Sequence, residues 1–205
     1  VQAMVDAMNG QGSCGRGSHT SELSAARSIF YTREMLARLF AFHYPERVVF
    51  TANATQALNA ALWGLLNPGD HVIATDWDHN SVLRPLHTLA KERGVKVDYL
   101  SADRQGRLEY DRLEGLLRPS TKLLVGTHAS NLTGNLLDVA RMSAFAKKHG
   151  LIFLLDAAQT AGSTPISMEK MGVHLLAFTG HKGLMGPQGT GGLCVCLLYT
   201  SPSPR

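Results

Sequence analysis

Short apolar runs recur along the chain, each separated from the next by a polar or amphipathic segment. The runs are rich in Val, Ile, Leu and Phe and are bounded by Gly, Pro, Asn or Asp, which is typical of β-strands. They fall at residues 47–51, 71–75, 95–100, 122–127, 151–155, 175–179 and 192–198. The runs at 123–126 and 151–155 are apolar throughout, which indicates strands covered on both faces, as in a parallel sheet.

Helical periodicity fills most of the intervals between these runs. An apolar stripe predicts a helix of about 20 residues, with Ser21 as its N-cap and Glu22 in its first turn. Further helices are predicted at 55–66, 82–93, 110–117 and 139–149. The glycine-rich residues 9–19 predict a loop within an N-terminal loop segment, 1–22.

The alternation of strands and helices predicts an α/β fold. We expect a doubly wound, mostly parallel sheet with helices on both faces and an antiparallel last strand at 192–198. In such sheets ligands bind beyond the carboxyl ends of the strands. The residues that follow each strand are therefore the first candidates for a functional site.

Polar side chains follow three of these strands, the first, the second and the fourth. Ala54, Thr55 and Gln56 follow the first strand and open a helix, where backbone N–H groups and a hydroxyl can bind an anion. The alternative is an ordinary Thr N-cap. His79 follows the second strand and Asn131 the fourth, and the alternatives there are a surface histidine and turn chemistry.

An acid and a lysine end two further strands. Asp156 directly follows the apolar run 151–155, so it is poorly solvated and needs a cation, either a metal ion or a protonated ring nitrogen. Lys182 lies between glycines after the run 175–179, although a surface lysine whose stem covers apolar side chains remains an alternative. Neither a Walker A order nor a Gly-x-Gly-x-x-Gly after the first strand is present.

Composition and charge narrow the function classes. The 205 residues are 44% hydrophobic and 18% charged, with a net charge of +4 and no Lys/Arg block, which favours a globular protein with a mixed surface over a nucleic-acid binder. No apolar run could span a membrane and no leader is recognisable. The three cysteines lack zinc-type spacing, so we expect a reducing, cytoplasmic location. No H-x-H or H-E-x-x-H spacing supports a metal-dependent hydrolase, the most distant alternative.

Together, the candidates match the needs of pyridoxal 5'-phosphate. Its aldehyde needs a lysine amine, its ring nitrogen a carboxylate, its phosphate hydrogen-bond donors, and its ring a flat neighbour. At this point the chain resembles the class V aminotransferase family of fold-type I pyridoxal-phosphate enzymes, and within it the cysteine desulfurase and selenocysteine lyase branch. The resemblance is carried by Ala-Thr-Gln at 54–56, Asp-His-Asn-Ser-Val at 78–82, His-Ala-Ser-Asn at 128–131, Asp-Ala-Ala-Gln at 156–159 and Thr-Gly-His-Lys at 179–182.

The resemblance implies a role for each matching position. Lys182 would form the internal aldimine and move the Cα proton, Asp156 would keep the pyridine nitrogen protonated, and His79 would stack on the ring and act in acid–base steps. The other implied cofactor contacts are Gln159 and Asn131 near the phenolic oxygen, and Ala54, Thr55, Gln56, Thr179 and His181 around the phosphate. The loop at 15–19 would lie near the substrate entrance.

The resemblance also implies a reaction and partners. L-Cysteine would lose its sulfur to an enzyme thiolate, leaving alanine and a persulfide, in a homodimer that passes the sulfur to an acceptor protein. An aminotransferase, a selenocysteine lyase, a β-lyase or a racemase on the same scaffold stays an alternative.

Family members run to roughly twice this length, so residues 23–198 would be an incomplete large domain. The second domain would supply the nucleophilic cysteine, since Cys14, Cys194 and Cys196 do not match its position, and the isolated chain is then expected to be inactive. Residues 199–205 are proline-broken and unlike the family, and they are interpreted as a non-native tail.

Overall fold

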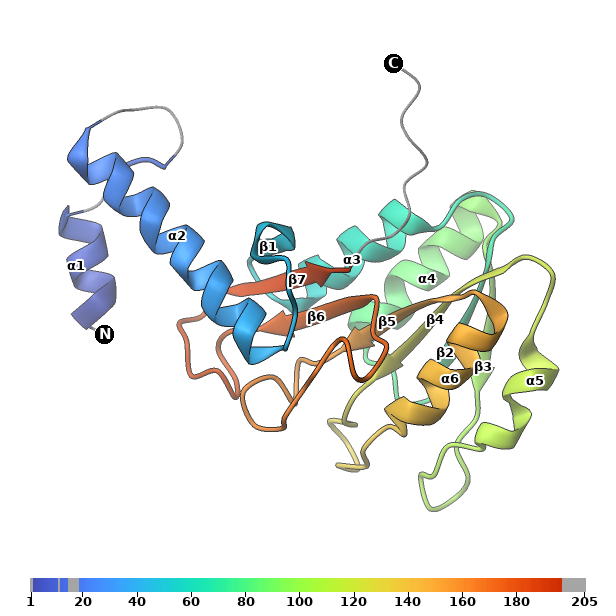
Figure 1. The fold of residues 1–205 in the computed structure, drawn as a ribbon. Helices are drawn as coiled ribbons and strands as arrows, with labels where there is room; N and C mark the ends of the chain where they lie inside the picture. The colour runs from blue at the N-terminus through green and yellow to red at the C-terminus, as the bar shows by residue number, and fades with distance from the viewer. Residues whose placement is uncertain (1, 11, 15–18, 197–205) are drawn as a thin grey trace.

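A computed structural model describes residues 2–10, 12–14 and 19–196, and its helices and strands follow the expected alternation (Figure 1). The strands are β1 (Val48–Thr51), β2 (His71–Thr75), β3 (Lys96–Leu100), β4 (Thr121–Thr127), β5 (Ile152–Asp156), β6 (Leu175–Thr179) and β7 (Gly191–Val195). The α-helices are α1 (Gln2–Gly10), α2 (Thr20–Leu39), α3 (Ala54–Leu65), α4 (Asn80–Arg93), α5 (Leu113–Leu116) and α6 (Val139–His149). Two 3-10 turns are η1 (Pro45–Arg47) and η2 (Tyr110–Arg112).

The strands form a single seven-stranded sheet in the order β1-β7-β6-β5-β4-β2-β3. The five strands from β2 to β6 are parallel to one another, whereas β7 pairs antiparallel with both β6 and β1. The mostly parallel α/β sheet and the antiparallel last strand are therefore confirmed. Thr127 and Asp156 lie opposite each other where β4 and β5 end, so both side chains reach the carboxyl edge of the sheet.

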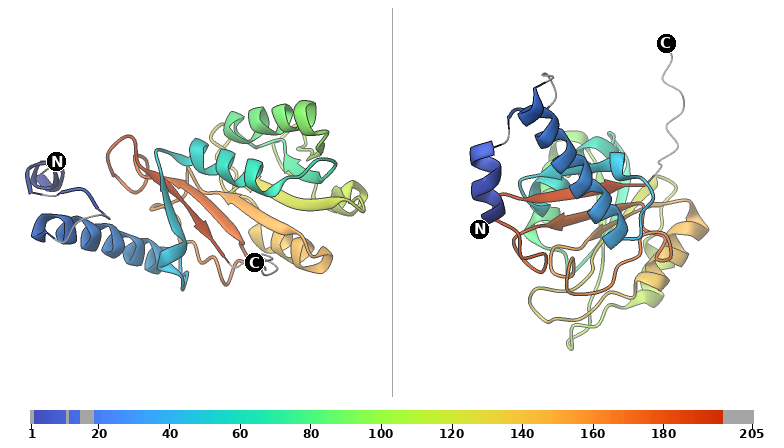
Figure 2. Two further views of the ribbon diagram at one scale, coloured as in Figure 1. Left: turned by 90° about the horizontal axis from the view of Figure 1, so that it is seen from above. Right: turned by 60° about the vertical axis from the view of Figure 1, so that its left-hand side comes forward.

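Helices cover both faces of the sheet (Figure 2), and an apolar cluster packs between each face and its helices. On one face, Leu58 of α3 and Leu86 of α4 pack in one cluster with Val125 of β4. On the other face, Met142 of α6 packs in a cluster with Leu124 and Phe153. Consecutive residues of β4 thus enter opposite layers, as the two-residue repeat of a strand requires. Burial of each of these Leu side chains contributes about 1.5–3 kcal/mol to the stability of the fold. This packing holds the strands whose ends carry the site.

The N-terminal segment differs from the prediction. Gln2–Gly10 form helix α1, where the loop segment 1–22 was expected, and an amide of Gln2 donates to Asp6 one turn later. Helix α2 begins at Thr20, so the prediction of Ser21 as N-cap was wrong. His19 is the N-cap, and its backbone N–H donates to the Glu22 carboxylate at 3.3 Å. This bond to the residue three positions after the cap stabilises the start of α2 at Thr20. Of the expected loop at 15–19, only His19 is among the described residues.

Smaller differences concern element ends. Helix α4 begins at Asn80, two residues before the predicted start, and β7 ends at Val195. Residues 197 and 198 and the predicted tail, 199–205, lie outside the described residues. In the part of the chain that the structure describes, no helix is long and apolar enough to cross a membrane.

Candidate active site

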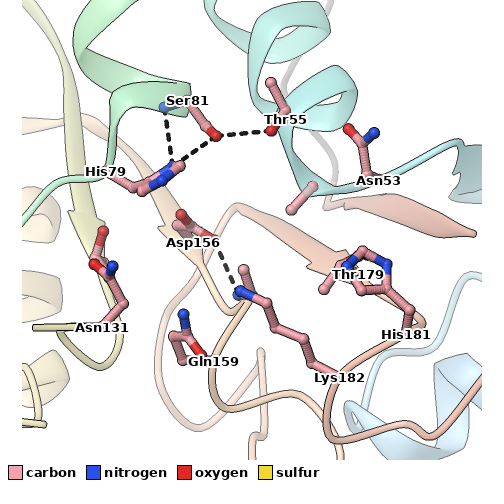
Figure 3. A pocket seen from close by; sticks show the side chains of 13 residues that line it. Asn53, Thr55, His79, Ser81, Asn131, Asp156, Gln159, Thr179, His181 and Lys182 are labelled. Atoms are coloured by element: carbon pink, nitrogen blue, oxygen red, sulfur yellow. Dashed lines mark hydrogen bonds between the residues drawn. The ribbon is translucent and has the colours of Figure 1, made fainter. Parts of the chain in front are cut away.

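A cavity of about 120 Å³ opens at the carboxyl edge of the sheet, where most of the predicted site residues meet (Figure 3). Its buried floor includes Ala54, Thr127, Asp156 and Thr179. The remaining lining residues are Asn53, Thr55, His79, Ser81, Asn131, Ala158, Gln159, His181 and Lys182. Every predicted site residue except Gln56 therefore lines this cavity, and they come from segments that follow five different strands.

Gln56 does not line the cavity, because its groups complete the start of α3. Its backbone N–H donates to Asn53 Oδ1 at 2.9 Å, and its side-chain oxygen accepts from the Ala52 N–H at 2.7 Å. The prediction had overlooked four residues that do line it, Asn53, Ser81, Thr127 and Ala158. Asn53 and Ser81 each stand within two residues of a predicted site residue, which is the signal that could have found them.

The loop that carries Lys182 is held by close backbone packing between two glycines. A Cβ on Gly183 would lie 2.5 Å from the Ala161 carbonyl oxygen, and one on Gly162 would lie 2.6 Å from Gly183. Gly162 also has φ of +86°, which L side chains rarely adopt. This packing leaves the Lys182 side chain extended into the cavity toward Asp156 (Figure 3).

Asp156 is a buried carboxyl group at the cavity floor. Its Oδ1 accepts the Ala158 N–H at 2.9 Å, and its second oxygen has no hydrogen-bond partner among the described residues. Burial raises the pKa of Asp156, while the charges of His79 and Lys182 act to lower it. A buried acid with one oxygen free is a site for a cationic or N–H-bearing group.

The start of α3 supplies donors at another part of the cavity. The N–H groups of Ala54 and Thr55 have no acceptor within the described part of the chain, and they stand at the positive end of a 12-residue helix. The Thr179 hydroxyl is hydrogen bonded to His181 Nδ1 at 2.9 Å nearby. This arrangement suits a phosphate group.

His79 is joined to the start of α3 by a chain of hydrogen bonds. Its Nδ1 accepts the Ser81 N–H at 3.1 Å and is 2.8 Å from Ser81 Oγ, and Ser81 Oγ is 2.7 Å from Thr55 Oγ1. The imidazole is therefore the N-cap of α4 as well as a wall of the cavity.

A second buried acid, Asp78, ties together the ends of two strands beside the cavity. Its Oδ2 accepts the Thr75 N–H of β2 at 2.7 Å, and its Oδ1 accepts the Thr127 hydroxyl of β4 at 2.9 Å. The β2–β4 register runs only from His71 to Ile73, so Asp78 joins the strands beyond the point where their pairing stops. Burial is the largest cause that raises the pKa of Asp78 to about 7.

We expect Asp78→Asn to remove a pH dependence of stability. Because the folded-state pKa of about 7 lies above the ordinary 3.8, the stability that Asp78 contributes is complete below about pH 4 and is lost as the pH rises to 7. The loss is about 4 kcal/mol. Asn can accept from Thr75 and donate to Thr127, so the urea midpoint of the variant should fall less between pH 5 and pH 8 than that of the wild type. The control Asp103→Asn, in an exposed turn, should keep the wild-type slope, and a wild type without a slope would contradict the expectation.

The cysteines and the potential metal ligands lie apart from this arrangement. Burial raises the pKa of the Cys194 thiol to about 12, and Cys14 is exposed; neither lines the cavity. Within residues 2–10, 12–14 and 19–196, no group of three His, Cys, Asp or Glu side chains is placed to hold a metal ion.

The residues present fit pyridoxal 5'-phosphate by the chemistry of their donors and acceptors. The free oxygen of Asp156 suits a protonated ring nitrogen, the open N–H groups of Ala54 and Thr55 suit a phosphate, and Lys182 supplies an amine in the same cavity.

A comparison with protein families decides the relationship. The sequence model described as Aminotransferase class-V matches residues 1–198. The chain belongs to this family. Class V aminotransferases depend on pyridoxal phosphate, in agreement with the cofactor that the cavity fits.

Cysteine desulfurases are among the similar members. A probable cysteine desulfurase of Pyrococcus abyssi is 33% identical over 183 residues, which cover 88% of this chain and 45% of the relative. The apo structure of cysteine desulfurase from Thermococcus onnurineus NA1 is 32% identical with a TM-score of 0.87, over 95% of this chain and 50% of that one. SspA, solved in complex with cysteine, is 26% identical with a TM-score of 0.85, over 95% and 58%. The chain thus spans about half the length of the curated relatives it matches.

Proposed function

We propose that residues 23–198 are the cofactor-binding part of a pyridoxal-phosphate-dependent cysteine desulfurase. The substrate would be L-cysteine and the product alanine, with the sulfur transferred to an enzyme thiol as a persulfide. The observation that supports this most is that Lys182 and Asp156, from segments after neighbouring strands, line one cavity. The similarity to cysteine desulfurases and to a protein that binds cysteine supports the substrate.

Each lining residue has a task in this proposal. Lys182 Nζ is the amine that holds the cofactor's carbonyl carbon, and once released it carries the proton between substrate atoms. Asp156 keeps a proton on the ring nitrogen, and the N–H groups at 54–55 with Thr179 and His181 hold the phosphate. Asn131 and Gln159 bind the phenolic oxygen, and the His79 ring covers one face. When bound, the cofactor supplies an electron sink for the pair left at Cα.

The open N–H groups of Ala54 and Thr55 at the positive end of α3, with the side chains of Thr179 and His181 in the same cavity, support the phosphate as the anchor of the cofactor. In the proposed reaction the sulfur of the substrate is transferred to a thiolate. No cysteine lines the described cavity, so this cavity does not supply that thiolate. We therefore propose that the nucleophile belongs to another part of the full-length protein. From the similarity to cysteine desulfurases we also propose that the full-length protein acts as a homodimer.

The test uses the full-length protein that contains this chain, loaded with pyridoxal phosphate and supplied with L-cysteine and a thiol reductant. We expect sulfide and alanine in equal amounts, because each turnover moves one sulfur atom to the enzyme and one proton to the substrate carbon. Transfer of the amino group to a keto acid without release of sulfide would instead assign an aminotransferase. A protein that binds no pyridoxal phosphate would contradict the proposal as a whole.

A further inference from the structure

The His79 ring is held at one of its nitrogens by two groups of a single residue (Figure 3). His79 is the N-cap of α4, and its Nδ1 lies 3.1 Å from the backbone nitrogen of Ser81 and 2.8 Å from Ser81 Oγ. Ser81 Oγ in turn lies 2.7 Å from Thr55 Oγ1. Ser81 is only 7% exposed, so water competes little for these bonds.

The backbone of Ser81 determines which ring nitrogen of His79 carries the proton. An N–H group can only donate, so Nδ1 accepts from it with a lone pair, and a neutral ring then has its proton on Nε2. The Ser81 hydroxyl faces the same lone pair and donates to it, and the Thr55 hydroxyl donates to Ser81 Oγ. All three hydrogen bonds therefore favour one tautomer of His79, the one with Nε2–H.

This tautomer limits what His79 can do with a proton. The ring could take one up only at Nδ1, where the new N–H would face the Ser81 N–H and end the bond that caps α4. Release of the Nε2 proton would leave an anionic ring in its place. Nε2 makes no hydrogen bond within the described part of the chain, and the ring lines the cavity. Its N–H is therefore available to a ligand in the cavity.

We propose that Ser81 is a positioning residue that holds His79 as a hydrogen-bond donor at Nε2 and keeps it from serving as a proton acceptor. The ligand that accepts from Nε2 would be the bound amino acid, and for this identity the inference rests on the proposed function. Transfer of the Cα proton then falls to Lys182, and a fixed hydrogen bond replaces the acid–base steps that the family resemblance implies for His79. The same ring thus caps α4 with one nitrogen and offers a donor to the cavity with the other.

The tautomer is measured by NMR in the cofactor-free chain labelled with ¹⁵N-histidine. Protonated and bare ring nitrogens have well-separated ¹⁵N shifts, and His79→Gln assigns the signals of His79. His87, which is exposed on the same helix and lies outside the cavity, is the internal reference. At pH 8 we expect the ratio of Nε2–H to Nδ1–H to be at least about fivefold higher for His79 than for His87, the factor of one net hydrogen bond.

Variants of Ser81 test its role as the positioning residue. Ser81→Ala keeps the backbone N–H but lacks the hydroxyl, and it should lower the ratio for His79 by about fivefold, whereas Ser81→Thr keeps both donors and should retain the wild-type ratio. Thr88→Ala removes another hydroxyl of α4, bonded to the Arg84 carbonyl away from the cavity, and should leave the ratio unchanged. Circular dichroism of each variant checks that it is folded.

Two substitutions of His79 separate its two nitrogens in the full-length protein. The side-chain N–H of Gln reaches about as far as Nε2 of His, so His79→Gln keeps a donor in the cavity but loses the cap. The side-chain oxygen of Asn reaches about as far as Nδ1 and suits an N-cap, so His79→Asn keeps the cap but loses the donor. Neither amide can take up a proton at neutral pH. We expect His79→Gln to release sulfide from L-cysteine at least about tenfold faster than His79→Asn, and His79→Asn to unfold at the higher urea concentration.

The outcomes distinguish this inference from the proposed function. Equal ratios for His79 and His87, or equal losses of about 10²–10⁴-fold in turnover in both His79 variants, as for a proton carrier, would each overturn the inference. A ratio that Ser81→Ala leaves unchanged would overturn the positioning role of Ser81. A dominant Nε2–H signal, in a protein that binds no pyridoxal phosphate, would support the inference and refute the proposed cofactor. Sulfide release by a full-length protein whose His79 carries its proton on Nδ1 would leave the function standing and refute the inference.

Discussion

Replacement of Lys182 by Ala is expected to abolish the near-visible absorption that pyridoxal phosphate should develop on binding. The band requires a covalent bond between the cofactor's carbonyl carbon and an amine, and Lys182 supplies the only lysine amine among the residues that line the cavity. In the full-length protein, loss of both this bond and the proton carrier should lower turnover by about 10⁴-fold or more. Absorbance titration of the chain and sulfide release by the full-length protein measure the two effects.

Two further variants show whether the amine or its charge matters. Lys170→Ala removes an exposed lysine away from the cavity and should keep the band. Lys182→Arg keeps a positive charge near Asp156 but has no amine that can form the bond, so it should retain phosphate-dependent binding without the band. A band that survives in Lys182→Ala, or a borohydride-reduced cofactor found on another lysine, would refute the role of Lys182.

The sheet could be predicted because its interior strands carry an unambiguous signal. The run at 151–155 is apolar at every position, and in the structure its side chains enter two different cores. A strand buried on both faces leaves only its ends for polar groups. For this reason Asp156, the first charged residue after the run, could be placed at the edge of the sheet before its neighbours were known.

The contacts between segments could not be predicted in the same way. The turn after β2 contains three residues of types that can cap a helix, Asp78, Asn80 and Ser81. In the structure His79 is the cap, because the Asp78 carboxyl group accepts a hydrogen bond from the Thr127 hydroxyl, 49 residues away in the sequence. Likewise, Thr55 and Ser81 meet only because α3 and α4 pack side by side on one face. The local sequence identifies the residues that could form these contacts, and tertiary packing determines which of them do.

Asp156→Asn is expected to separate stability from function. The amide oxygen can keep the bond from the Ala158 N–H, so the shape of the site is retained while the charge is lost. Because burial raises the pKa of Asp156, its ionised form is disfavoured in the folded chain, and the cofactor-free variant should be at least as stable as the wild type at pH 8. Urea unfolding of the two chains measures this difference.

Turnover, in contrast to stability, should decrease in Asp156→Asn. Without a carboxylate, the ring nitrogen loses the partner that keeps it protonated, and the electron sink weakens, so turnover of the full-length variant should fall by about 10²–10⁴-fold. Pyridoxal phosphate methylated at that nitrogen carries a permanent positive charge and should restore part of the lost rate in Asp156→Asn but not in Lys182→Ala. Asp76→Asn alters another acid that follows β2 outside the cavity, where it accepts the Ala102 N–H, and it should leave turnover unchanged. Equal losses in both Asp variants, or no rescue by the methylated cofactor, would mean that Asp156 supports the fold and does not hold the ring nitrogen.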